Sequence, residues 1–142
     1  MRLHHILAAF VIVAGFAPSG FAYFFGGVQT KLEYRSFAKH LETCAPLHQD
    51  LHDLFRTGMS VDREIYGAAD GACRIRIGAY DGNDLLCSFA MGQAPRLAEA
   101  FRDQAKMIGL FGGYEMRIST SDPDPLTQLY NSPQCALDSE QA

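Results

Sequence analysis

Apolar side chains recur at three- and four-residue steps in several parts of the chain, which is the spacing of one face of an α-helix. Residues 30–44 show this pattern, and Pro46 should end or kink the helix that they form. The same helical spacing resumes over residues 47–55. Two further helices are expected at residues 95–108 and 126–131, because a proline opens the first and an aspartate cap precedes the second.

Four other segments have the alternating or short apolar pattern of β-strands. They are residues 63–66, 73–77, 85–91 and 114–119. Turn signals at residues 68–71 and 81–84 separate the first three. The element order is therefore α-β-β-β-α-β-α. We predict an α+β fold: a three-stranded antiparallel meander plus a fourth strand, packed on one face by helices. The pattern leaves open the strand order and which helices cover the sheet.

The N-terminus has the order of a secretory signal peptide. A basic start at Arg2 precedes an apolar run over residues 6–16, and small residues follow where a cut would fall. Apolar character then resumes, so residues 6–28 are also long enough for an uncleaved membrane anchor. We expect export, with residues 1–22 as a signal peptide or as part of that anchor. Residues 23–142 should form a single small domain.

All four cysteines lie beyond the signal segment, and their number is even. We therefore expect two disulfides in a periplasmic or secreted protein, or in an anchored protein whose domain is on the non-cytoplasmic side of the membrane. A loop over residues 78–82 would place Cys73 opposite Cys87 on the buried face of a hairpin. We prefer the pairs Cys73–Cys87 and Cys44–Cys135, and the two crossed connectivities stay open.

Charge argues against nucleic acid as a partner. Residues 1–22 contain one arginine and no acidic residue, so residues 23–142 carry 11 basic and 16 acidic side chains, a net charge of −5. The basic residues are scattered along the chain, whereas phosphate-backbone binding needs clustered Lys and Arg. Contact with a membrane is expected only through an uncleaved N-terminal segment.

Histidines and one cysteine are spaced by fours at His40, Cys44, His48 and His52. On a helix, His48 and His52 would lie on one face, as metal-ligating pairs do. A solvated polar face explains the same residues, and Pro46 interrupts the run. We therefore assign no metal and no cofactor, and keep a metal-binding protein that uses His40, His48 and His52 as an alternative.

Arginines on the outer side of the predicted strands suggest an interaction face. Arg74, Arg76 and Arg117 should point away from the core, with Tyr80 in phase with the first two. Arg and Tyr are enriched at protein interfaces. An ordinary solvated sheet face accounts for the same pattern.

Sequence motifs for catalysis are missing: there is no Gly-x-Ser-x-Gly, and with paired cysteines there is no thiol nucleophile. We therefore predict a non-enzymatic, disulfide-stabilised module that is exported and binds an envelope or extracellular protein. The alternatives are the metal-binding protein above, and an enzyme or inhibitor whose site is assembled only by tertiary structure.

Overall fold

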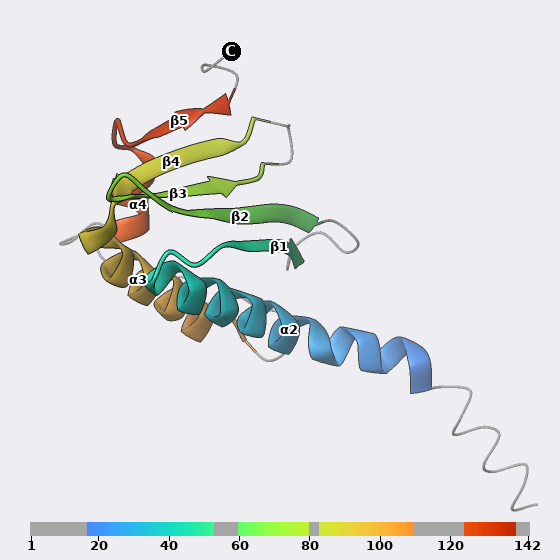
Figure 1. The fold of residues 1–142 in the computed structure, drawn as a ribbon. Coiled ribbons are helices and arrows are strands. Elements are labelled where there is room, and N and C mark those ends of the chain that lie inside the picture. Colours follow the sequence, from blue (N-terminus) through green and yellow to red (C-terminus); the bar gives the residue numbers. More distant parts are fainter. Residues whose placement is uncertain (1–16, 53–59, 80–82, 110–123, 139–142) are drawn as a thin grey trace, which may run out of the picture.

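A five-stranded antiparallel sheet forms one layer of the protein (Figure 1). The computed structural model describes residues 17–52, 60–79, 83–109 and 124–138. The strands follow one another across the sheet in the order of the sequence: β1 (Leu47–His52), β2 (Ser60–Ala69), β3 (Ala72–Ile77), β4 (Leu85–Ala90) and β5 (Cys135–Leu137). The predicted α+β class and the three-stranded meander, β2-β3-β4, are confirmed. The strand predicted at residues 114–119 lies outside the described residues.

The helices form the second layer. The long helix α2 (Ala17–Glu42) and α3 (Ala94–Met107) lie side by side on one face of the sheet, as Figure 1 shows. A short 3-10 turn, η1 (Met91–Gln93), leads into α3, and α4 (Pro125–Tyr130) packs against α3 and the end of β4. The predicted cap of α4 is confirmed, because the Asp124 side chain accepts a hydrogen bond from the Thr127 amide.

Aromatic side chains fill the space between the two layers. Phe37 of α2, Phe89 of β4 and Phe101 of α3 are each at most 2 % exposed. The rings of Phe37 and Phe101 meet edge to face, with their centroids 4.9 Å apart. Burial of side chains of this size is worth about 1.5–3 kcal/mol each, so this contact between the helices and the sheet is a main source of stability.

Helix α2 begins thirteen residues before the predicted start at Thr30. Pro18 stands in the first turn of the helix, where its missing N–H costs no hydrogen bond. Residues 1–16 of the proposed signal or anchor lie outside the described residues. Within the described part of the chain, no helix has both the length and the apolar character needed to cross a membrane.

The helix predicted over residues 47–55 is wrong at its start, because residues 47–52 are strand β1. Helix α2 ends in a Schellman motif, in which the Cys44 and Ala45 amides bond back to the Leu41 and His40 carbonyls. Cys44 has a φ of 52°, so the chain leaves the helix sharply and enters the sheet. Exposure then alternates along β1, as on a strand with one face buried.

Two irregular positions shape β2. Asp70 and Gly71, with φ of 53° and 77°, form the tight turn between β2 and β3 that the sequence predicted. Before this turn, the pairing with β3 shifts between Ile65 and Gly67, which leaves Tyr66 as the extra residue of a β-bulge. Gly67 has a φ of +105°, and a Cβ built on it would lie 3.2 Å from Pro46 Cγ.

The disulfide pairing that we preferred from the sequence is wrong. The structure joins Cys44 to Cys73 and Cys87 to Cys135, one of the alternatives left open. The loop between β3 and β4 spans residues 78–84 rather than 78–82, so Cys87 lies opposite Ile75 instead of Cys73. The shift of two residues keeps the same faces buried, but it separates those two cysteines along their strands.

We expect Gly67→Ala to lower the free energy of unfolding by about 1–2 kcal/mol, because a side chain is disfavoured at this φ and would press on Pro46. Denaturant unfolding of the purified protein measures the change. Gly92→Ala is the matched control, since nothing lies within 4 Å of its added Cβ. Equal effects of the two substitutions would contradict this account of the bulge.

We expect non-reducing peptide mapping to recover Cys44 linked to Cys73 and Cys87 linked to Cys135. Replacing either pair by two alanines should reduce stability by about 2–4 kcal/mol, because the unfolded chain gains freedom. Recovery of a Cys73–Cys87 peptide from the native protein would show that the register of β3 and β4 is different.

Candidate functional site

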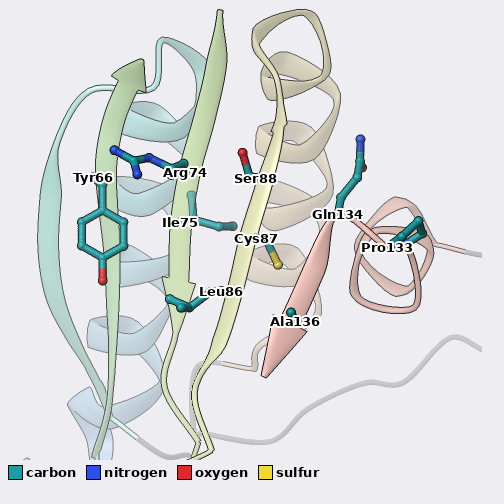
Figure 2. A pocket seen from close by; sticks show the side chains of 9 residues that line it. All are labelled: Tyr66, Arg74, Ile75, Leu86, Cys87, Ser88, Pro133, Gln134 and Ala136. Carbon is teal, nitrogen blue, oxygen red and sulfur yellow. The ribbon is translucent and has the colours of Figure 1, made fainter. Parts of the chain in front are cut away.

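The face of the sheet opposite α2 and α3 is the candidate site. Figure 2 shows this open face in front of the strands, with the helices behind them. The even-numbered side chains of β3 and β4 point toward it, whereas Cys73, Ile75 and Cys87 are buried on the helical side. Strand geometry alone produces this division, because successive side chains point to opposite faces.

A depression of about 530 Å³ lies on this face, over β2 to β5. Tyr66 and Arg74 stand at one side of it, and Pro133 and Gln134 at the other (Figure 2). Leu86, Ser88 and Ala136 line the part between them. The depression therefore combines an aromatic ring, one cation and apolar side chains, a composition common in the centres of protein interfaces.

The walls of the depression are held by covalent and backbone contacts. The Cys87–Cys135 disulfide joins β4 to β5 at a directly opposed pair; Cys87 is among the residues that line the depression, although it is only 2 % exposed and its side chain lies on the helical side of the sheet. The Ser88 amide also donates to the Gln134 carbonyl, at 2.8 Å. On the opposite side of the depression, the bulge in β2 positions Tyr66, which is 46 % exposed. These restraints give the depression a fixed shape.

Arg74 and Arg76 both lie on the outer side of β3, but they differ in their partners. Arg76 contacts three carboxylates: Asp62, Asp84 at 2.6 Å and Glu64 at 3.4 Å. The hydrogen bond that Arg76 donates to Asp84, followed by the charge of Asp62 and the hydrogen bond to it, raises the pKa of Arg76 above its ordinary value. Within the described residues no ion pair forms at Arg74, so its charge is available to a ligand. Tyr80 and Arg117, predicted for the same face, lie outside the described residues.

The histidines do not form the arrangement that the helical spacing predicts. His40 is on α2, where its Nδ1 is 2.9 Å from the Ser36 carbonyl, and His48 and His52 are on strand β1. Four residues span about 13 Å along a strand, so the His48 and His52 side chains are too far apart to bind one ion together. His52 instead contacts Glu33, at 2.9 Å. Among the described residues, no three His, Cys, Asp or Glu side chains gather as metal ligands do.

Sequence reasoning missed a buried arginine. Arg63 of β2 points toward the helices and is 2 % exposed. Its guanidinium carbon lies 4.5 Å from the ring centroids of both Tyr34 and Phe37 and 5.6 Å from that of Phe101. Burial lowers the pKa of Arg63, although it stays a cation. The signal was present, because Arg63 has the same parity as the buried Ile65.

We expect Arg76→Met to reduce stability by about 1 kcal/mol, because three neighbouring carboxylates would lose their shared cation. The loss should shrink at high salt, which screens the remaining repulsion. Arg74→Met, on the same strand, is the control and should change stability by less than about 0.5 kcal/mol. Urea unfolding at low and high salt measures both; equal losses would contradict the difference in partners.

Comparison with known proteins adds no further assignment. No protein-family model, no curated protein and no solved structure was found to match this chain. We therefore argue the function from the open sheet face of the described molecule, where Arg74 and Tyr66 line the depression.

Proposed function

We propose that this is a non-enzymatic binding domain of the periplasm or the extracellular space, which holds another envelope or extracellular protein on its open sheet face. The observation that carries the proposal is the depression around Arg74, where a cation with no ion pair among the described residues lies beside apolar side chains. Two disulfides support an oxidising compartment.

The chemistry of the depression favours an acidic segment of the partner. A carboxylate can form a bidentate pair with the Arg74 guanidinium, and an apolar side chain next to it can pack on Leu86, Pro133 and Ala136. Tyr66 adds a large surface at small entropic cost, as tyrosines do in binding sites. Because the walls are held by the Cys87–Cys135 bridge, binding needs little reordering of the domain.

The absence of a free thiol supports binding rather than covalent chemistry. All four cysteines of the chain are in disulfides. Among the described residues that line the depression there is no histidine or carboxylate beside Ser88 that could act as a base for its hydroxyl. Binding is therefore the function that its side chains can perform.

A photo-reactive amino acid in place of Ser88 tests the proposal in cells that express the protein naturally. Ser88 is exposed and lines the depression, so a partner seated there should cross-link as one defined adduct. Adding Arg74→Glu should reduce the adduct at least about tenfold, because it replaces attraction to a carboxylate by repulsion.

The matched control places the same cross-linker in the same protein with Arg35→Glu, an exposed arginine of α2 on the helical layer. This substitution changes the net charge by the same amount as Arg74→Glu, but it should leave the adduct intact. If Arg35→Glu reduces the adduct as strongly as Arg74→Glu, only net charge matters and the proposed site is wrong. The same conclusion follows if no defined adduct forms from position 88.

A further inference from the structure

A second hollow adjoins the depression on the open sheet face. It is a cleft of about 250 Å³ between the start of α3 and α4, and its lining residues include Gln93, Arg96 and Gln128. Gln134 lines both hollows. The cleft and the depression therefore meet just before β5, so one ligand can extend from one into the other.

The residues between the two hollows form a continuous row across the strands. Arg74 of β3 lies directly opposite Ser88 of β4, and the Ser88 amide donates to the Gln134 carbonyl. Figure 2 shows these three residues at one level of the sheet. The Gln134 side chain then donates to Gln93 Oε1, at 3.1 Å, and Gln93 directly precedes α3. The row thus leads from Arg74 to within three positions of Arg96.

Arg96 is the cation of the cleft, as Arg74 is the cation of the depression. Arg96 is exposed, and among the described residues no carboxylate forms an ion pair with it. The first turn of α3 contains no acidic side chain, and Glu99, one turn further along, contacts Arg102 at 3.1 Å and Lys106 at 3.7 Å. Each end of the row therefore has an arginine whose charge is available to a carboxylate from outside the domain.

Apolar side chains lie beside the arginine in both hollows. Those of the cleft come from α3 and from α4 with its first turn, and they are Leu97, Pro125 and Leu129. A ligand in the cleft can therefore pack an apolar group next to its carboxylate, as in the depression. Because the same chemistry recurs in two adjoining hollows, we favour a single bound chain that presents acidic and apolar side chains in turn.

We infer that the partner binds through one extended acidic segment that crosses both hollows, an inference that rests on the binding function proposed above. One carboxylate of the segment pairs with Arg74 and a second with Arg96. Arg74 and Gln134 are two strand spacings apart, about 10 Å, which is the reach of three extended residues. Arg96 lies beyond Gln134, so the two acidic residues stand at least three positions apart in the segment.

Photo-cross-linking from the cleft tests the inference in cells that express the protein naturally. Gln128 is exposed on α4 and lines the cleft, so a photo-reactive amino acid there should form an adduct with the same partner as position 88. Mass spectrometry of the two adducts identifies the attached partner residues. We expect them in one segment with at least two Asp or Glu, fewer than about ten residues apart, because ten extended residues span about 33 Å and the five strands only about 19 Å.

Charge reversal distinguishes one continuous segment from two independent sites. Arg96→Glu should reduce the adduct from position 128 at least about tenfold and the adduct from position 88 at least about threefold, since the segment loses one of two anchors. Arg74→Glu should also reduce the adduct from position 128, although Arg74 does not line the cleft. Arg35→Glu, the control on α2, should leave both adducts intact. Glutamate suits the first turn of a helix, so Arg96→Glu should have a thermal midpoint no lower than that of the wild type.

The inference is overturned if position 128 forms no defined adduct while position 88 does, or if the two positions attach to different proteins or to distant segments of one protein. It is also overturned if Arg74→Glu leaves the adduct from position 128 unchanged, because the cleft would then be a separate site. These outcomes leave the proposed function intact. Absence of an adduct from position 88 contradicts the proposed function itself, and the inference with it.

Discussion

Burial of one face of the sheet under α2 and α3 is the constraint on which the rest of the structure depends. Phe37 and Phe101 come from the two helices and meet Phe89 of the sheet in the same layer. Once the odd-numbered side chains of the strands face these helices, the even-numbered ones must face outward. The open face with Arg74 and the buried position of Arg63 are therefore two results of one packing arrangement.

The central meander could be predicted because its signals agree with each other. Alternation in β3, the Asp70–Gly71 turn and the proline at the start of α3 all point to the elements found. Strand β1 was missed because Leu47 and Leu51 fit a helical step of four as well as an alternating strand. Strand β5 has three residues, Cys135–Leu137, which is too short for any periodicity to be recognised.

The candidate sites could be predicted only in part. The face to which a strand side chain points follows from local alternation, whereas its partners depend on how the strands are aligned. Alternation was enough to place Arg74 and Arg76 on the outer face. The pairing of Arg76 with Asp62 and Asp84 depends on how β2, β3 and the loop before β4 are aligned. The preferred disulfide pairs were wrong for the same reason, because they depended on a different register of β3 and β4. Arg63 was overlooked because an arginine among the inward-facing apolar positions of a strand is usually assumed to extend its guanidinium to solvent.

The two bridges join neighbours along the chain: the first cysteine to the second, and the third to the fourth. A polypeptide that enters an oxidising compartment from its N-terminus presents Cys44 and Cys73 before Cys87 and Cys135. Each thiol then finds its native partner in the next cysteine to arrive, or in the one just before it. Oxidation in order of arrival therefore gives the native pairs directly, without the reshuffling that takes seconds to hours in chains with crossed bridges.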